Sequence, residues 1–159
     1  MRSYRQSIVS NEPENVYICE RMMPKASRKG NCKSTSGEPL MEKDTCPFCQ
    51  NRELLLASNQ HAFAIPDRRP VSSGHSLIVS YSHVATIFDL PLVEYAACFE
   101  LVREVKELLS KDENTESFNV VVNCGPNANQ TVDHAHIHLV PRYRGVPLPS
   151  ATDAWSSIR

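Results

Sequence analysis

The alternation of apolar and polar positions predicts four short strands in the part of the chain that follows residue 60. These segments are rich in β-branched or aromatic residues, and turn-forming residues or a long helical pattern separate them. The segment over 118–123 reads Phe-Asn-Val-Val-Val-Asn, a run typical of a buried strand. The expected strands are residues 61–66, 75–80, 118–123 and 134–141.

A long amphipathic helix is predicted between the second and third of these strands. Over residues 90–111, most apolar side chains recur at spacings of three and four, which places them on one helical face. Asp89 lies directly before this segment, where its carboxylate is expected to cap the first turn. The order strand, strand, helix, strand, strand predicts an α+β fold in which an antiparallel sheet carries one main helix.

The first part of the chain differs from the rest. Residues 24–44 are dominated by Lys, Arg, Ser, Gly, Pro and Glu and hold few large apolar residues, a composition typical of an extended or partly irregular segment. We therefore expect an N-terminal arm over 1–44, a folded domain over 45–145 and a C-terminal tail over 146–159.

Length and charge narrow the class of protein. The chain has 159 residues, which suits one domain. Its 17 basic and 18 acidic side chains give a net charge of −1, so a protein that coats nucleic acid is not expected. Residues 1–20 hold several charges and no continuous apolar stretch, and no apolar run approaches 18 residues. We expect a cytoplasmic protein that neither crosses a membrane nor carries an export signal.

Three histidines alternate with apolar residues in the run His134-Ala-His136-Ile-His138. Side chains alternate between the faces of a strand, so a strand here would place all three imidazoles on one face, about 7 Å apart. Imidazole titrates near neutral pH, and burying several without partners is costly. A surface cluster and a metal site made of all three are alternatives, but the pattern favours catalysis with at least one histidine as nucleophile or base.

A second motif is the pair of cysteines in Cys46-Pro-Phe-Cys49. In a reducing compartment this spacing is typical of metal ligands or of a redox pair. Two unrelated core cysteines would give the same pattern. The residues alone leave these three interpretations open.

Two segments resemble the histidine triad (HIT) family. Residues 123–142 read Asn-Cys-Gly-Pro-Asn-Ala-Asn-Gln-Thr-Val-Asp-His-Ala-His-Ile-His-Leu-Val-Pro-Arg, which is similar to the family signature of histidines alternating with apolar residues. Residues 67–79, Asp-Arg-Arg-Pro-Val-Ser-Ser-Gly-His-Ser-Leu-Ile-Val, resemble the family's ribose-binding strand-turn-strand. The resemblance covers about residues 46–144. It implies an antiparallel sheet of about five strands with one main helix, and a homodimer formed by pairing the sheets.

The resemblance also implies roles for individual residues. His136 would be the nucleophile that attacks the α-phosphorus of a small-molecule nucleotide and forms a nucleotidyl-histidine intermediate. Asp67 would bind the ribose hydroxyls, and His75 would complete the site. The residues expected to hold phosphate oxygens or orient the leaving group are His138, Asn123, Gln130 and Thr131.

Zinc is implied by a subset of the family. Zinc-bearing members place a Cys-x-x-Cys pair before the sheet and complete the ligand set with two histidines. The matching residues here are Cys46, Cys49, His83 and His134. Two thiolates and two imidazoles suit tetrahedral zinc without an open position, so the resemblance implies a structural site.

Several alternatives concern substrate and mechanism. The resemblance to the zinc-containing dinucleoside polyphosphate hydrolase branch favours a hydrolase of dinucleoside polyphosphates or adenylylated compounds. A nucleoside phosphoramidase or nucleotidyltransferase would use the same histidine, and a zinc-stabilised nucleotide-binding module would use none.

Asn129 stands where the family usually has Gly; Asn tolerates positive φ, so the loop is expected to form. Trp155 in the tail is a candidate for stacking on a base or leaving group.

Overall fold

The computed structural model describes residues 42–50, 54–147 and 158, and all of them belong to one compact unit that spans residues 39–159. The expected N-terminal arm and the C-terminal tail with Trp155 therefore fall almost wholly outside the described residues. Most of the domain expected over 45–145 is described, and its boundaries remain a prediction.

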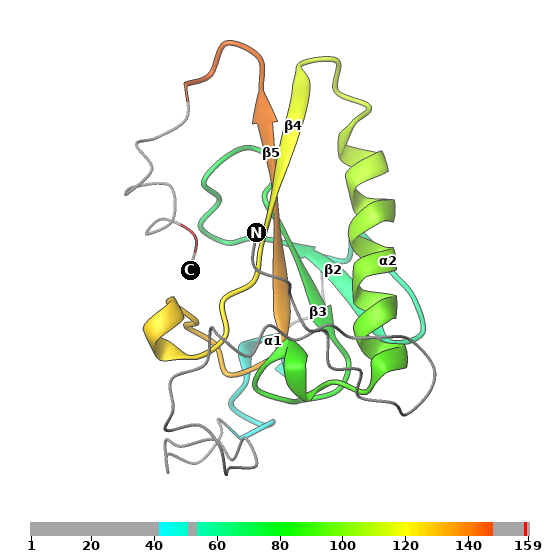
Figure 1. The fold of residues 1–159 in the computed structure, drawn as a ribbon, viewed down its shortest axis with the longest axis vertical. Coiled ribbons are helices and arrows are strands. Elements are labelled where there is room, and N and C mark those ends of the chain that lie inside the picture. The colour runs from blue at the N-terminus through cyan, green and yellow to red at the C-terminus, as the bar shows by residue number, and fades with distance from the viewer. Residues whose placement is uncertain (1–41, 51–53, 148–157, 159) are drawn as a thin grey trace, which may run out of the picture. The chain divides into compact units, whose positions relative to one another are not determined.

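A five-stranded sheet forms the centre of this unit (Figure 1). Its strands are paired in the order β1-β2-β3-β5-β4, and every neighbouring pair is antiparallel. The predicted antiparallel α+β fold is therefore confirmed. The first strand has only two residues, too few for an alternation pattern to reveal. The strands are β1 (Ala57–Ser58), β2 (Ala62–Pro66), β3 (Ser76–Ser80), β4 (Thr115–Val121) and β5 (His136–Tyr143).

The long helix α2 (Leu92–Leu109) packs along one face of the sheet (Figure 1). Its residues Leu101 and Val105 meet the fully buried Ile78, Ile137 and Leu139 of β3 and β5. Burial of these apolar side chains is the main force that fixes the helix to the sheet. Among the described residues, no helix combines the length and apolar character needed to cross a membrane.

The opposite face of the sheet carries the functional side chains. The register pairs Leu77 with His138 and Val79 with His136, and these four residues lie on the face away from α2. Leu77 and Val79 pack there against Phe48 of the short helix α1 (Pro47–Gln50). The strict alternation of β5 thus sends Ile137 into the helical core and the flanking histidines to the other side.

The predicted start of the long helix was wrong in one respect. Asp89 does not cap α2; the N-cap residue is Pro91, without a side-chain cap. Asp89 instead ends the short 3-10 helix η2 (Ile87–Asp89), where its carboxylate accepts hydrogen bonds from the backbone N–H and the hydroxyl of Thr86 at 3.0 and 2.8 Å. Proline at position 91 allows the chain to turn into α2 because its φ is already suited to a helix start.

The turn before β3 depends on a glycine. Gly74 has φ +74°, and a Cβ at this position would lie 3.1 Å from Leu109 Cδ2 and 3.2 Å from Pro141 Cγ. The same loop is tied to β5 because the Ser72 hydroxyl donates to the Pro141 carbonyl at 2.7 Å. This close approach fixes where His75, the next residue, enters the sheet.

Replacing Gly74 by alanine should destabilise the fold by about 2–3 kcal/mol, because strain at positive φ adds to crowding against Leu109 and Pro141. Gly145→Ala is a matched control: Gly145 also has φ +74°, but nothing lies within 4 Å of its added Cβ. We expect a loss of about 1 kcal/mol there. Urea denaturation of both variants measures the difference. Equal losses would contradict a packing role for Gly74.

Candidate active site and metal centre

Two cysteines and two histidines converge beside the start of β5. Cys46 Sγ lies 3.3 Å from His134 Nδ1, and Cys49 Sγ lies 3.3 Å from His83 Nδ1 and 3.6 Å from His134 Nδ1. The backbone of α1 makes this possible, because the Cys49 N–H donates to the Cys46 carbonyl at 3.1 Å and turns both thiols to one side. The four donor atoms all lie within 4.8 Å of one another.

This donor set fits zinc. Ligand atoms around tetrahedral zinc are separated by about 3.3–3.7 Å when the bonds have their usual lengths, and the measured separations of 3.3–3.6 Å agree with that spacing. The other ring nitrogen of His134, Nε2, donates to the Ser80 carbonyl at 2.8 Å. Such a hydrogen bond puts the ring hydrogen on Nε2, so Nδ1 carries the lone pair that a metal ion needs, and it holds the ring in place. These residues could therefore hold a metal ion.

His134 lies on the same side of the sheet as His136: both rings contact Phe48, and Ala135 between them joins the core against α2. His134 is nevertheless outside the strand. It lies in a bend just before β5, which begins at His136. The bend allows the His134 side chain to reach the cysteines while its backbone carbonyl remains beside His136. His136 and His138 lie within β5, with ring centroids 5.0 Å apart.

The bend at His134 fixes the protonation of His136. His136 Nδ1 lies 2.7 Å from the His134 carbonyl oxygen, which can only accept, so Nδ1 carries the hydrogen. Burial lowers the pKa of His136, partly offset by this hydrogen bond and by Asp67, so the ring is neutral near pH 7. Its Nε2 therefore keeps a lone pair, and no described residue forms a hydrogen bond with it. A neutral imidazole with a free Nε2 is the form that acts as a nucleophile.

Phe48 joins the metal-binding cluster to His136. Its ring stands edge-on to His136 at a centroid distance of 5.2 Å and to His134 at 5.8 Å. Because Phe48 lies between Cys46 and Cys49, the position of this contact depends on the two thiols. Phe48 was not among the predicted site residues, although its place inside the cysteine motif was the available signal in the sequence.

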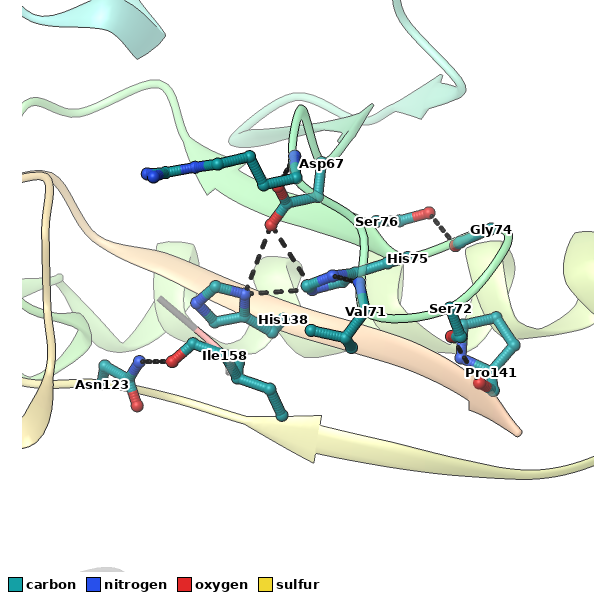
Figure 2. A network of polar contacts seen from close by, with 11 residues as sticks. Asp67, Val71, Ser72, Gly74, His75, Ser76, Asn123, His138, Pro141 and Ile158 are labelled. Atoms are coloured by element: carbon teal, nitrogen blue, oxygen red, sulfur yellow. Dashed lines mark hydrogen bonds and ion pairs between the residues drawn. The ribbon is translucent and has the colours of Figure 1, made fainter. Parts of the chain in front are cut away.

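His75, His138 and Asp67 form a second cluster on the same face, as Figure 2 shows. His75 Nε2 and His138 Nδ1 are 3.1 Å apart, and Asp67 Oδ2 lies 3.5 Å from the former and 3.9 Å from the latter. Burial lowers the pKa of both histidines. The neighbouring His136 and His75 lower the pKa of His138 further, to about 3, so His138 is neutral near pH 7. His138 Nε2 is buried and has no hydrogen-bond partner among the described residues.

A cavity of about 270 Å³ opens beside the two histidine clusters. Its walls are mainly apolar, and His136, Asp67 and Thr131 supply polar groups. Arg68 and Arg69, both exposed, add positive charge at its rim. The apolar residues that line it are Pro47, Phe48, Leu54, Ile65, Pro66, Leu77 and Val132. An apolar pocket with a few convergent polar groups is the usual form of a small-molecule site.

The loop before β5 accepts Asn129 where a glycine was expected. Asn129 has φ 66° and ψ 21°, the left-handed conformation, at the end of the 3-10 helix η3 (Pro126–Ala128). Asparagine is among the few residues that tolerate this conformation. The expectation that the loop forms despite the missing glycine is therefore confirmed.

Gln130 is placed differently from the expectation that it faces phosphate. Its Oε1 accepts from the Gly125 N–H at 2.6 Å, and its Nε2 donates to the carbonyls of Ala85 and Val132 at 2.6 and 2.9 Å. The side chain is buried and its amide groups are bound within the chain. Gln130 thus holds the loop that carries Thr131 and approaches the cavity.

Gln130→Glu should lower the free energy of unfolding by about 3 kcal/mol at neutral pH, because a carboxylate would face the carbonyls of Ala85 and Val132. Gln60→Glu makes the same chemical change at an exposed position and should cost less than about 0.5 kcal/mol. Denaturant titration at neutral pH gives both values. If the two substitutions prove equally mild, Gln130 does not brace this loop.

Asn123 contacts the C-terminal end of the described chain. Its Nδ2 donates to the Ile158 carbonyl at 3.0 Å, beside His138 (Figure 2). The Ile158 side chain is 2% exposed and packs against Val121 and Val140. One amide hydrogen of Asn123 is therefore used within the chain. In the sequence, the signal for this contact was an isoleucine in a polar tail, but it did not indicate where Ile158 would pack.

Comparison with known proteins places the fold and motifs in one family. Adenylylsulfatase HINT3 of Arabidopsis thaliana is 34% identical over 125 residues, which cover 72% of this chain and 64% of that protein. A bis(5'-adenosyl)-triphosphatase of Saccharomyces cerevisiae is 29% identical over 93 residues, covering 58% of this chain and 45% of that protein. The chain thus spans less than two thirds of the length of these two relatives.

A solved structure shares the fold. The zinc-bound histidine triad family protein from Mycobacterium smegmatis superimposes with a TM-score of 0.63 and 25% identity, covering 73% of this chain and 89% of that one. Residues 49–145, more than half of the chain, match the HIT domain. The chain therefore belongs to the histidine triad (HIT) family.

Proposed function

We propose that this protein hydrolyses the α-phosphate linkage of dinucleoside polyphosphates or adenylylated compounds through a nucleotidyl-histidine intermediate on His136. The observation that carries the proposal is the 2.7 Å hydrogen bond from His136 Nδ1 to the His134 carbonyl, which leaves the Nε2 lone pair available beside the cavity. The names of the relatives, an adenylylsulfatase and a bis(5'-adenosyl)-triphosphatase, support adenylyl compounds as the substrate class.

The cavity suits a nucleoside next to this nucleophile. Its apolar walls, with Phe48 and Leu77, would receive the flat base, whose burial favours binding. The Asp67 carboxylate would accept hydrogen bonds from the ribose hydroxyls, since an ionised carboxylate has several acceptor sites. The α-phosphate would then lie between His136 and His138.

The reaction would proceed in two displacements at phosphorus. His136 Nε2 attacks the α-phosphorus, a P–N bond forms, and the bond to the leaving group's bridging oxygen breaks with its electron pair. Water then attacks the same phosphorus, the P–N bond breaks, and the nucleoside monophosphate is released while a proton passes to solvent. Splitting the reaction in this way lets one neutral histidine replace a poorly nucleophilic water in the first step.

The remaining site residues would bind and orient the substrate. His138 would hold an α-phosphate oxygen, and His75 would complete the site by orienting the His138 ring. Thr131 would contact the leaving group, and Asn123 would supply its second amide hydrogen to a phosphate oxygen. Gln130 would act through the loop that it braces.

Zinc would be held by Cys46, Cys49, His83 and His134, and it would link α1 to the start of β5 without an open position for chemistry. A zinc-bound structural relative supports this choice of metal. We also propose that the protein is cytoplasmic, since thiolate ligands suit a reducing compartment. We propose in addition that it is a homodimer. The outer edge of β4, which pairs with no other described strand, offers a surface for joining two sheets.

The intermediate provides the test. Protein mixed with a dinucleoside triphosphate and denatured rapidly at alkaline pH, where phosphohistidine bonds survive, should yield a peptide that contains His136 and has gained one adenylyl group. Mass spectrometry identifies that peptide. Turnover without any adenylylated His136 would contradict the proposed intermediate.

A substrate panel separates the alternatives. A dinucleoside polyphosphate, adenylyl sulfate and a lysyl phosphoramidate differ only in the leaving group attached to the adenylyl phosphorus. Preference for the phosphoramidate would make the protein a phosphoramidase, and transfer to an added acceptor would make it a transferase. Nucleotide binding without any turnover would leave a zinc-stabilised binding module.

A further inference from the structure

The turn between β2 and β3 places a backbone amide against the outer nitrogen of His75. The Val71 N–H donates to His75 Nδ1 at 3.4 Å, and the structure gives this amide no other acceptor among the described residues. An amide N–H can only donate, so the nitrogen that faces it must hold a lone pair. A neutral His75 consequently carries its hydrogen on Nε2.

The tautomer of His75 in turn determines the tautomer of His138. His75 Nε2 lies 3.1 Å from His138 Nδ1 and 3.5 Å from Asp67 Oδ2, so its hydrogen points at two acceptors. His138 Nδ1 then accepts, and the hydrogen of the neutral His138 ring must lie on Nε2. The reverse arrangement would direct two N–H groups, those of Val71 and His75 Nδ1, at each other.

This series of hydrogen bonds ends at the Nε2 atom of His138. His138 Nε2 is buried and has no partner among the described residues, and a buried N–H without an acceptor is unfavourable. We propose that the Val71 backbone amide sets the tautomers of His75 and His138 so that His138 presents an N–H to an oxygen of the α-phosphate. Val71 is thus a positioning residue that acts through two neutral imidazoles.

The cluster of Asp67, His75 and His138 could in principle hold a metal ion or pass hydrogen bonds to phosphate. Their donor atoms lie close enough to hold a metal ion. A metal on His75 Nε2 would need that nitrogen to lose its hydrogen, which the Val71 amide opposes by occupying the Nδ1 lone pair. The cluster is therefore a hydrogen-bond relay toward phosphate, with Asp67 as a second acceptor for the His75 hydrogen.

The relay predicts a signature in the unaltered protein. Nitrogen-15 NMR of the zinc-loaded full chain near pH 7 should show His75 and His138 as neutral rings, each with its hydrogen on Nε2. This measurement is independent of catalysis, whereas the phosphate contact rests on the proposed function. A hydrogen on His75 Nδ1, or a protonated His75, would overturn the proposal even if the protein is an active hydrolase.

A pair of variants separates the amide from the side chain. Val71→Pro removes the N–H, and Val71→Ala keeps it. We expect Val71→Pro to lower kcat about 10-fold to 100-fold with KM changed less than about 3-fold, because the contact matters most as charge develops on phosphate. It should also mix the two tautomers of His75 in the NMR spectrum. Val71→Ala should retain both kcat and the tautomer.

Two outcomes would overturn the proposal at this step. The first is Val71→Pro with unchanged kcat and an unchanged His75 tautomer. The second is an equal loss of kcat in Val71→Ala, which would assign the effect to side-chain packing. If Val71→Pro does not fold, the NMR spectrum of the unaltered protein still decides whether the amide sets the tautomer.

Discussion

His136→Asn should reduce hydrolysis to background, a loss of at least about 1,000-fold in kcat, while the protein remains folded. Asparagine can keep a donor near the His134 carbonyl, but it has no lone-pair nitrogen with which to attack phosphorus. The loss should appear in kcat rather than in nucleotide binding, because Asp67 and the apolar lining of the cavity are unchanged. Steady-state kinetics and nucleotide titration of the same preparation measure both quantities.

His61→Asn is the matched control for this variant. His61 lies directly before β2, and no hydrogen bond of its side chain is found among the described residues. Activity close to that of the unaltered protein is expected there. A His136→Asn protein that still turned over substrate would remove His136 from the role of nucleophile. Unfolding of His136→Asn would be recognised by circular dichroism and would require His136→Gln in its place.

The fold could be predicted from the sequence because its longest elements have the clearest periods. The apolar spacing over α2 arises from burial against the sheet, and the apolar run of β3 is buried on both faces. The Val-rich run of β4 predicted the strand but not its exposure, since Val121 alone of β4 is buried and Val120 is 47% exposed. The predicted and observed boundaries of the elements differed where a helix cap determined them. Asp89 was assigned to the wrong helix because a carboxylate before an apolar segment can serve either a 3-10 turn or the helix that follows.

The site was predictable to the level of residues but not of atoms. The sequence motifs named the cysteines, the histidines of the site and Asp67; the structure brings seven of these residues into two clusters, with His136 in contact with Phe48 and His138. The alternation rule could not show that His134 lies in a bend before the strand, where it contacts Cys46 and Ser80. Sequence patterns also carry no information on backbone amides, so the role of Val71 required the structure.

Loss of the metal site should weaken both the fold and the catalytic step. Cys49 contacts His83 and His134, and the carbonyl of His134 holds His136 Nδ1. Phe48, held between the two cysteines, packs against the ring of His136. Zinc bound by these residues, as proposed, would support the tautomer and the orientation of the nucleophile without touching substrate. Its contribution to folding would be large because the ligands come from segments far apart in the sequence.

Cys49→Ser should accordingly lower the zinc content from about one ion per chain to near zero, the free energy of unfolding by at least about 3 kcal/mol, and kcat by at least about 10-fold. Elemental analysis, denaturant titration and kinetics measure the three effects. Cys124→Ser is the control: burial raises the pKa of the Cys124 thiol, and the residue lies outside the four-residue cluster, so zinc and activity should be retained. If a zinc-free protein kept full stability and full kcat, the coupling between His134 and His136 would not operate through the metal.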